Sequence, residues 1–363
     1  MECCILKVNR LTVLVKPASG LCQMSCKYCF YKEMESCGAQ PGMIMTKTVV
    51  DSLILMIKAK LSPSGIVTIA FQGGEPLLAG IEFYNYFFNA ISIQNINAQY
   101  IFQTNGICIS DDINGEKWIA LFKKYNCIIG LSVDGDASSH DINRVFNDGA
   151  PTHHLVMKAY RRMIDAGICV NFLTVLSKSV LNSPSKLYNF YKRSNVEYVQ
   201  LIPCLPPIGE NDTIDRDILA DFLMNFYNYW IDDFRKNSCP PFEVREFSAI
   251  INALQGNISD PCVFSGKCNA QLVIESDGNI YPCDFYVLPE YCTGNVIDTS
   301  IDDTLCSSGI KKFITDKPKL ADQCKACRYL SACNGGCRRM QDVWRPDIDG
   351  CPMKKFINHI LNE

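Results

Sequence analysis

The chain has 363 residues, of which 48% are hydrophobic, and its formal net charge is −3. This length and apolar share suit one large domain with a substantial core plus a smaller domain. The small acidic charge gives no basic field, so we expect neither nucleic acid nor an anionic membrane as a partner. No apolar run approaches the roughly 18 residues of a membrane span, and the first residues lack a signal-peptide pattern. We therefore expect a cytoplasmic protein.

Cysteine accounts for 21 of the residues, which is a large number for a chain of this kind. Disulfide frameworks are typical of small secreted domains, whereas clustered cysteines in a large cytoplasmic chain bind metal or carry out redox chemistry. The cysteines therefore indicate metal or redox sites, and such sites make the protein sensitive to oxygen.

From about residue 11 to residue 203, short runs rich in Val, Ile, Phe or Tyr alternate with amphipathic stretches. The predicted strands are 12–16, 66–71, 99–103, 128–133, 169–174 and 196–202. The predicted helices between them are 46–60, 81–94, 116–125, 152–166 and 184–193. This alternation predicts βαβ units and a parallel sheet. Six units fall short of a closed barrel of eight, so we predict an α/β fold with a partial, open (β/α)6 barrel. Its site should lie at the carboxyl ends of the strands.

The loop after the first predicted strand carries Cys22, Cys26 and Cys29 in a C-x3-C-x2-C row. Three thiolates on one short loop can hold three irons of a [4Fe–4S] cluster, because cysteine thiolate is the usual cluster ligand. The fourth iron then stays open, and a small molecule can coordinate and react there. Zinc is the alternative, although structural zinc normally takes four ligands.

Glycines and polar groups follow the next predicted strands. Gly73 and Gly74, in Phe71-Gln-Gly-Gly-Glu-Pro76, let the backbone approach a ligand closely. Gln103-Thr-Asn-Gly106 and Ser132-Val-Asp-Gly135 end the third and fourth strands, and Asn143-Arg144 follows. The guanidinium of Arg144 is suited to pair with a carboxylate of a ligand. Ordinary strand-to-helix turns are the alternative interpretation of each segment.

The pattern changes after Pro203. Residues 214–234 predict a longer helix whose aromatic face lies in the core, and cysteines crowd from about Cys239 onward. We therefore predict two domains, 1–235 and 236–363. Eight clustered cysteines of the second domain fit two fully ligated [4Fe–4S] clusters or two zinc sites. They are Cys262, Cys268, Cys283, Cys324, Cys327, Cys333, Cys337 and Cys351.

Ten cysteines remain without an assigned role. Three of them, Cys108, Cys127 and Cys169, lie in or near apolar runs, and we predict that they are small core residues. The others are Cys3, Cys4, Cys37, Cys204, Cys239, Cys292 and Cys306.

The Cys22–Cys29 row, with an aromatic before its last cysteine, and the later Gly-Gly-Glu-Pro segment together resemble the radical S-adenosylmethionine (SAM) family. The C-terminal cysteine pattern resembles the SPASM domain of that family. Further segments match its anaerobic sulfatase-maturating branch: Lys16-Pro-Ala-Ser-Gly, Cys29-Phe-Tyr31, Gly130-Leu-Ser-Val-Asp-Gly, Tyr281-Pro-Cys283-Asp284 and Cys333-x-Gly-Gly-Cys337-Arg-Arg. The similarity weakens over residues 204–215, and the spacing from Cys337 to Cys351 is shorter than the branch leads us to expect. These departures concern the substrate more than the chemistry.

The resemblance implies a partial radical SAM barrel followed by a small Cys-rich SPASM domain, with three [4Fe–4S] clusters and SAM as cofactors. It assigns Cys22, Cys26 and Cys29 to the SAM-binding cluster. It assigns Cys262, Cys268, Cys283 and Cys337 to auxiliary cluster I, and Cys324, Cys327, Cys333 and Cys351 to auxiliary cluster II. The implied SAM contacts are Tyr28, Gly73, Gly74, Glu75, Ser132, Arg144 and Leu205. Asp284 would be the proton acceptor, with Tyr31 and Gln72 as hydrogen-bonding groups on the substrate side.

The implied activity is an oxidation of a cysteine or serine of a sulfatase to Cα-formylglycine by means of a 5′-deoxyadenosyl radical. The implied partners are an unfolded or nascent sulfatase polypeptide and an external one-electron donor such as flavodoxin or ferredoxin. One alternative is a SPASM-type maturase that forms thioether or carbon–carbon crosslinks in a ribosomally made peptide. Another is a non-catalytic electron-transfer protein, against which the open-iron triplet and the Gly-Gly-Glu-Pro segment argue.

Overall fold

The computed structural model describes residues 7–31, 43–205, 214–257, 262–266, 268–316, 320–340, 343 and 350–363. Three of the unassigned cysteines (Cys3, Cys4 and Cys37) lie outside these ranges, as does most of the segment around residues 204–215 where the family resemblance weakens.

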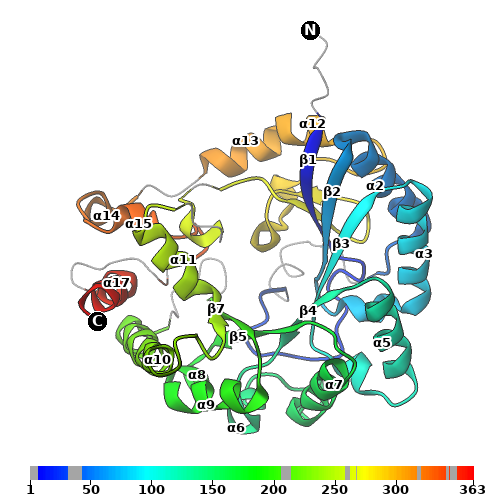
Figure 1. The fold of residues 1–363 in the computed structure, drawn as a ribbon. Coiled ribbons are helices and arrows are strands. Elements are labelled where there is room, and N and C mark those ends of the chain that lie inside the picture. The colour runs from blue at the N-terminus through cyan, green and yellow to red at the C-terminus, as the bar shows by residue number, and fades with distance from the viewer. Residues whose placement is uncertain are drawn as a thin grey trace.

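A nine-stranded sheet forms the centre of the molecule, in the order β7-β6-β5-β4-β3-β2-β1-β8-β9. Neighbouring strands are parallel except for the antiparallel pair β8 and β9. The strands are β1 (Val8–Val15), β2 (Leu61–Phe71), β3 (Asn97–Thr104), β4 (Ile128–Ser132), β5 (Val170–Leu176), β6 (Tyr198–Pro203), β7 (Glu243–Val244), β8 (Leu272–Ile274) and β9 (Ile280–Tyr281). All six predicted strands are present, and the sheet curves into an open barrel with helices on its outer side (Figure 1).

Helices alternate with the strands of the barrel as predicted. The longer ones are α2 (Lys47–Lys60), α3 (Ile81–Ile93), α5 (Asn114–Lys124), α7 (His153–Asp165), α9 (Pro184–Ser194) and α10 (Arg216–Asn237). Short helical turns between them are η1 (Pro76–Ala79), α4 (Ile107–Ser110), α6 (Ala137–His140) and α8 (Lys178–Leu181). Among the described residues, no helix combines the length and the apolar character needed to cross a membrane.

Local sequence explains why these elements form and how they pack. Helix α2 begins after Thr46, whose side chain accepts a hydrogen bond from the backbone N–H of Val49 and so caps the helix. Toward its carboxyl end, strand β2 alternates buried residues with exposed or partly buried ones, and its last residue, Phe71, is fully buried. The ring of Phe71 packs against those of Tyr84 and Phe102, with centroids 5.1 and 4.9 Å apart. The sheet and its helices thus share one apolar core.

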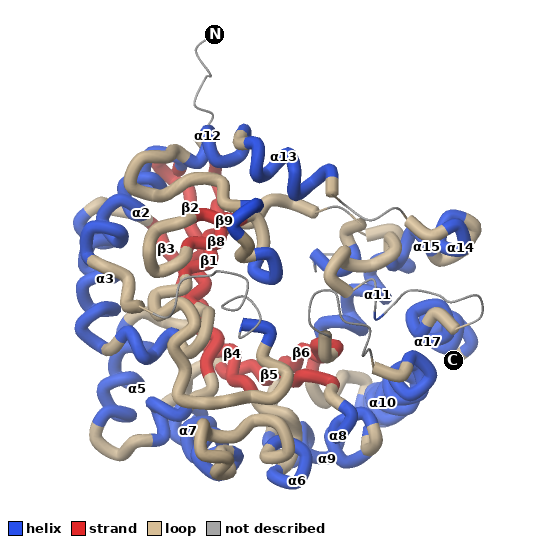
Figure 2. The backbone as a smooth tube through the Cα atoms, turned by 180° about the vertical axis from the view of Figure 1, so that it is seen from behind, coloured by secondary structure: helices blue, strands red, loops and turns tan. Residues whose placement is uncertain are grey.

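The C-terminal part is joined to the barrel at both edges of the sheet. Its elements are α11 (Arg245–Leu254), η2 (Cys262–Phe264), η3 (Asp284–Tyr286), η4 (Pro289–Tyr291), α12 (Ile301–Cys306), α13 (Ser308–Thr315), α14 (Asp322–Lys325), α15 (Leu330–Cys333) and α17 (Pro352–Asn362). Strand β8 pairs with β1 and strand β7 pairs with β6, although both follow the predicted domain boundary. Figure 2 shows α17 beside α10, and Lys355 of α17 forms an ion pair of 2.6 Å with Asp217 of α10. The division at residue 235 stays a prediction.

Candidate active site

The cysteine triplet lies on the loop that follows β1. The backbone N–H of Met24 donates to Sγ of Cys22 at 3.4 Å, and that of Cys29 donates to the carbonyl of Cys26 at 3.2 Å. Burial is the main reason why the pKa of the Cys22 thiol is raised to about 12, and nearby Glu75, Cys26 and Cys29 contribute to this rise. The three thiols are therefore electrostatic neighbours, and a metal bound there would be needed to keep Cys22 deprotonated at neutral pH.

The Gly-Gly-Glu-Pro segment is clamped against the start of this loop. The backbone N–H of Gly74 donates to the carbonyl of Ser19 at 2.5 Å, and that of Glu75 donates to the carbonyl of Leu21 at 2.7 Å. A Cβ atom on Gly74 would lie 2.3 Å from the Leu21 carbonyl oxygen, so a larger residue does not fit there without a backbone shift. Gly73 adopts a φ of +107°, which also favours glycine.

Glu75 anchors this segment to the end of β3. Its buried carboxylate accepts hydrogen bonds from the N–H of Leu77 (3.0 Å), the hydroxyl of Thr104 (2.7 Å) and the N–H of Asn105 (2.8 Å). Burial raises the pKa of Glu75 to about 7, although these hydrogen bonds lower it. The amide of Asn105 in turn donates to Sγ of Cys22 at 3.6 Å, so the end of β3 contacts the triplet directly.

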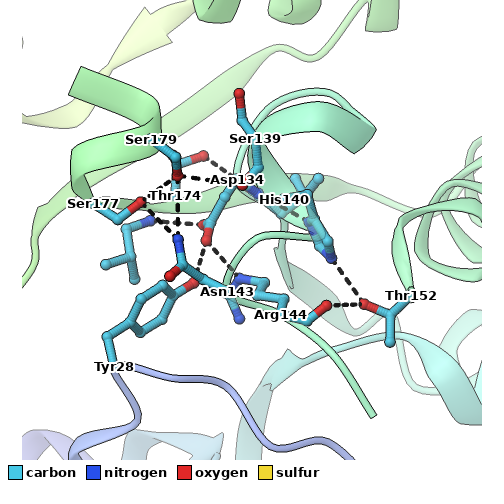
Figure 3. A network of polar contacts seen from close by, with 12 residues as sticks. Tyr28, Asp134, Ser139, His140, Asn143, Arg144, Thr152, Thr174, Ser177 and Ser179 are labelled. Atoms are coloured by element: carbon cyan, nitrogen blue, oxygen red, sulfur yellow. Dashed lines mark hydrogen bonds and ion pairs between the residues drawn. The ribbon is translucent and has the colours of Figure 1, made fainter. Parts of the chain in front are cut away.

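Tyr28, which lies between Cys26 and Cys29, forms a polar group with the buried residues Asp134 and Arg144 (Figure 3). Nε of Arg144 lies 3.0 Å from Oδ2 of Asp134, the Tyr28 hydroxyl donates to the same carboxylate, and the Arg144 guanidinium lies 5.4 Å from the Tyr28 ring centroid. Burial lowers the pKa of Arg144, but Asp134 outweighs it and raises that pKa above its usual value. Arg144 is thus a charged group at the predicted rim. The sequence did not reveal Asp134 as its partner.

The remaining predicted SAM contacts also lie at the carboxyl ends of strands. Ser132 is the last residue of β4, and Leu205 follows β6 and is partly buried against the main core. Their contact with SAM stays a prediction.

A second group of polar residues gathers where β1, β2 and β8 end. Nζ of Lys16 lies 2.7 Å from Oδ1 of Asp284 and 3.4 Å from Oε1 of Glu275. The Tyr31 hydroxyl donates to Glu275 at 2.7 Å, and its ring centroid lies 4.5 Å from Nζ of Lys16. Gln72 is next to them, because its backbone N–H donates to the carbonyl of the residue preceding Lys16 at 3.0 Å. The predicted proton acceptor Asp284 and the two predicted substrate-side residues, Tyr31 and Gln72, therefore lie close together at the carboxyl end of β1.

Sequence reasoning missed Glu275 in this group. It follows the three-residue strand β8, which is too short to show a periodic pattern. Lys16 was present in the Lys16-Pro-Ala-Ser-Gly segment, but nothing in that segment predicted its two carboxylate partners.

The eight C-terminal cysteines fall into two electrostatic groups. Burial raises the pKa of Cys262 and Cys283; Cys262 is also affected by Cys268 and Cys337, and Cys283 by Cys262 and Cys337. In the second group, burial raises the pKa of Cys324, with Cys327 and Cys351 adding to it. Burial likewise raises that of Cys333 to about 11, and there Cys324, Cys327 and Cys351 contribute. These are the two sets of four that the family resemblance implies.

Among the described residues, no three His, Cys, Asp or Glu side chains are arranged to hold a single metal ion. Cysteine thiolate is the usual ligand of a [4Fe–4S] cluster, and the assignment of cysteines to clusters stays a prediction.

The unassigned cysteines correct one expectation. Cys127 is 3% exposed and Cys108 is partly buried against the core, as predicted, but Cys169 is exposed. Cys169 directly precedes β5, where the strand has not yet entered the core. Cys108 also lies beside the triplet, because the amide of Gln23 donates to its sulfur at 3.8 Å.

Comparison with known proteins agrees with this site. Residues 17–190 match the Radical SAM superfamily, and residues 262–328 match SPASM, an iron-sulfur cluster-binding domain. The chain is 32% identical over 349 residues to the cysteine-type anaerobic sulfatase-maturating enzyme of Clostridium novyi (strain NT), which covers 92% of this chain and 90% of that relative. It is 28% identical over 350 residues to the serine-type anaerobic sulfatase-maturating enzyme of Bacteroides thetaiotaomicron, with 90% and 82% covered.

A solved structure, "Native anSMEcpe with bound AdoMet and Kp18Cys peptide", superposes with a TM-score of 0.86 at 28% identity and covers 97% of both chains. The two matched domains indicate iron–sulfur clusters and SAM as cofactors. The thiol groups and the polar groups around them are consistent with that chemistry. From the near full-length similarity and the shared fold, we conclude that this chain belongs to the anaerobic sulfatase-maturating enzymes, a family of radical SAM enzymes with a C-terminal SPASM domain.

Proposed function

We propose that this enzyme oxidises a cysteine of a sulfatase polypeptide to Cα-formylglycine. The choice of cysteine over serine is supported by the higher identity to the cysteine-type relative, 32% against 28% for the serine-type relative. The observation that carries the proposal is the contact between the triplet loop and the Cys283-Asp284 segment. Phe30, directly after Cys29, packs against Phe285, directly after Asp284, with ring centroids 5.0 Å apart.

Three [4Fe–4S] clusters would be held by the three thiol groups, and SAM by the open iron of the first together with Tyr28, Gly73, Gly74, Glu75, Ser132, Arg144 and Leu205. When bound, these cofactors supply a radical that removes a hydrogen atom from the substrate Cβ and an outlet for the second electron. The residues of this chain bind and orient the reactants around them.

Asp284 is the proposed proton acceptor for the substrate thiol. Its carboxylate is partly exposed, and Asp284 directly follows the proposed ligand Cys283. The carboxylate forms an ion pair with Lys16, and Nζ of Lys16 lies 4.5 Å from the ring centroid of Tyr31, two residues after Cys29. Loss of one hydrogen atom, one electron and the thiol proton converts the side chain to a thioaldehyde. Water then replaces sulfur, which leaves as hydrogen sulfide, and gives the aldehyde. Tyr31 and Gln72 are the proposed hydrogen-bonding groups that orient the substrate during this sequence.

The proposed partners follow from this chemistry. The target side chain must reach between two cofactor sites, so we propose that the sulfatase enters as an unfolded or nascent segment. An external one-electron donor such as flavodoxin or ferredoxin would start each turnover. Location in the cytoplasm stays a prediction.

The test is the mass of two peptides, one with a Cys-x-Pro-x-Arg motif and one with serine in place of cysteine. Each is incubated without oxygen with the reconstituted enzyme, SAM and a reductant. We expect the cysteine peptide to lose about 18 mass units as thiol becomes aldehyde, and the serine peptide to react more slowly, with a loss of about 2. A cysteine peptide that loses about 2 mass units without gaining an aldehyde would point to crosslinking instead. An unchanged peptide despite SAM cleavage would contradict the proposal.

A further inference from the structure

A buried lysine joins two carboxylates at the carboxyl end of the sheet. The side chain of Lys16 is fully buried, that of Glu275 is 7% exposed and that of Asp284 is 20% exposed. Burial lowers the pKa of Lys16, but Asp284 and Glu275 outweigh it and raise that pKa above its usual value. Lys16 is therefore an ammonium ion held between two acids.

The sheet itself fixes Lys16 and Glu275. They directly follow β1 and β8, which pair in parallel with Val15 opposite Ile274. The backbone N–H of Lys16 also donates to the carbonyl of Ile274 at 2.8 Å, which extends the ladder by one bond. Asp284, in contrast, begins the short turn η3, and Tyr31 lies two residues after Cys29, where a helix begins. Groups at strand ends are held more firmly than groups on short turns. Lys16 and Glu275 therefore form a rigid support for the Asp284 side chain, which lies on a turn.

The two carboxylates differ in how many partners they have. Glu275 accepts hydrogen bonds from the hydroxyls of Ser19 at 2.6 Å and Tyr31 at 2.7 Å, in addition to its contact with Lys16. Within the described part of the chain, the partner of the Asp284 carboxylate is the Lys16 ammonium, whose Nζ lies 2.7 Å from Oδ1. Glu275 thus contacts three side chains, whereas Asp284 is held by Lys16.

Stability alone does not account for this arrangement. Removing charged groups from water is costly, and an apolar set of similar volume often stabilises a fold as well or better. Here two carboxyl groups lie against one fully buried ammonium. Such an arrangement is expected where a carboxylate must be held in one orientation for chemistry.

We propose that Lys16 and Glu275 are positioning residues for the oxidation step. Glu275 holds Lys16 and the Tyr31 hydroxyl in place, and Lys16 holds the Asp284 carboxylate in one orientation beside Cys283. This inference rests on the proposed function, in which Asp284 accepts the substrate proton. Lys16→Met keeps the aliphatic stem that lies beside the proposed SAM contact Gly73. SAM is therefore still cleaved without the Lys16 ammonium, but proton removal is slowed. Formation of 5′-deoxyadenosine then becomes uncoupled from formation of the aldehyde.

The experiment compares Lys16→Met, Lys16→Arg and Glu275→Gln in the reconstituted holoenzyme with the cysteine peptide. We expect Lys16→Met to lower kcat for aldehyde formation roughly 10- to 100-fold, with little change in KM, because a misplaced proton acceptor costs about this much. Iron content and 5′-deoxyadenosine formation stay near wild type, so the ratio of aldehyde to 5′-deoxyadenosine falls. Lys16→Arg, which keeps the positive charge, restores part of that ratio, and Glu275→Gln lowers it in the same direction.

Lys60 offers a matched control. Lys60 is the last residue of α2, and its side chain is 9% exposed. It forms an ion pair with Asp302 of α12. Lys60→Met therefore breaks a comparable ion pair away from the site and leaves the product ratio unchanged. The proposal is overturned if Lys16→Met keeps the wild-type ratio, or if Lys60→Met lowers the ratio equally. Should Lys16→Met fail to fold, a wild-type ratio in Glu275→Gln overturns it.

Failure of the proposed function is a separate outcome. It is recognised when the wild-type enzyme cleaves SAM and leaves the cysteine peptide unchanged. Anaerobic crystal structures of the wild type and the folded variants then decide the positioning claim. Displaced Asp284 and Tyr31 side chains in the variants support it, and unmoved side chains contradict it.

Discussion

Gly74 sets the distance between the end of β2 and the triplet loop. Its N–H lies 2.5 Å from the Ser19 carbonyl oxygen, and a Cβ there would lie 2.3 Å from the carbonyl oxygen of Leu21. We expect Gly74→Ala to push the loop that carries Cys22 away from Glu75. Iron binding at the triplet should weaken, and SAM cleavage should fall at least about tenfold, because small misplacements at reacting groups are costly. The measurement is 5′-deoxyadenosine formation per iron bound.

Gly149→Ala is the control for this variant. Gly149 also lies in a loop, and a Cβ there meets no atom within 4 Å, although its φ of +86° makes alanine mildly strained. We expect normal SAM cleavage from it. If both glycine variants lose activity alike, close approach at Gly74 is not the reason.

His140 makes stability sensitive to acid. Its Nδ1 accepts from the N–H of Asp134 at 3.2 Å, so its Nε2 carries the ring proton and donates to the Thr152 hydroxyl oxygen at 3.1 Å (Figure 3). Burial is the main reason why the pKa of His140 is lowered to about 2, and nearby Arg144 and His153 contribute to this lowering. Unfolded histidine titrates near pH 6.5, so the stabilising effect is present above about pH 6.5 and is lost as the pH falls.

The His140→Gln variant removes this titration. Between pH 7 and pH 5.5, the free energy of unfolding of the wild type should fall by about 1 kcal/mol more than that of the variant. Urea denaturation at the two pH values measures the difference. Parallel pH dependence of the two proteins would show that His140 is not held neutral.

The sequence predicted those site residues that directly follow a predicted strand. Glycines 73 and 74 and the cation Arg144 fall directly after strands, and strand ends of a parallel sheet meet at one edge. The partner Asp134 and the hub Glu275 were missed, because their contacts depend on which loops meet in space. Cys169 was wrongly placed in the core, because an apolar neighbourhood in sequence does not tell where a strand enters the core.

At the level of elements, β2 shows how burial is divided along one strand. Phe71 at its end is fully buried among aromatic rings, whereas Ile66 is 39% exposed. We expect Phe71→Ala to lower the free energy of unfolding by about 3–5 kcal/mol, because it removes buried surface and leaves a cavity. Ile66→Ala on the same strand should cost less than about 1 kcal/mol. Chemical denaturation of both variants measures this, and equal losses would contradict the described burial.

The long elements were predictable, and the short ones were not. All six predicted strands and the helices between them have the length needed for a visible period. Strands β7, β8 and β9 have two or three residues each, so no period marks them. Yet β8 brings Glu275 beside Lys16, which is why part of the site could not be located from the sequence.

At the scale of the whole molecule, we predict that the C-terminal cysteines form two interlocked sets of cluster ligands. Cys337 is an electrostatic neighbour of Cys283, as is Cys262, although Cys324 and Cys333 lie closer to Cys337 in sequence. Cys351 is instead an electrostatic neighbour of Cys333, as is Cys324. We expect the wild type to bind about 12 irons, and Cys351→Ala to lose most of the about four irons of one cluster. Iron analysis after anaerobic reconstitution measures this, with the exposed Cys306→Ala as a control that keeps the full count.

The iron count can also contradict the assignment of the cysteines to two clusters. If Cys351→Ala keeps all its iron, or Cys306→Ala loses as much, the two sets of four are wrongly assigned. The count of eight cysteines came from the sequence and their grouping from family resemblance. The mutual influence of the thiols supports that grouping.

The central claim is that a carboxylate beside the Cys283 ligand completes an oxidation begun at the triplet loop. The direct test is the ratio of aldehyde to 5′-deoxyadenosine in Asp284→Asn and in the wild type. Wild-type enzyme should give about one aldehyde per 5′-deoxyadenosine, whereas Asp284→Asn should still cleave SAM, keep its iron and form aldehyde at least about 100-fold more slowly. An Asp284→Asn enzyme with the wild-type ratio and rate would contradict the account.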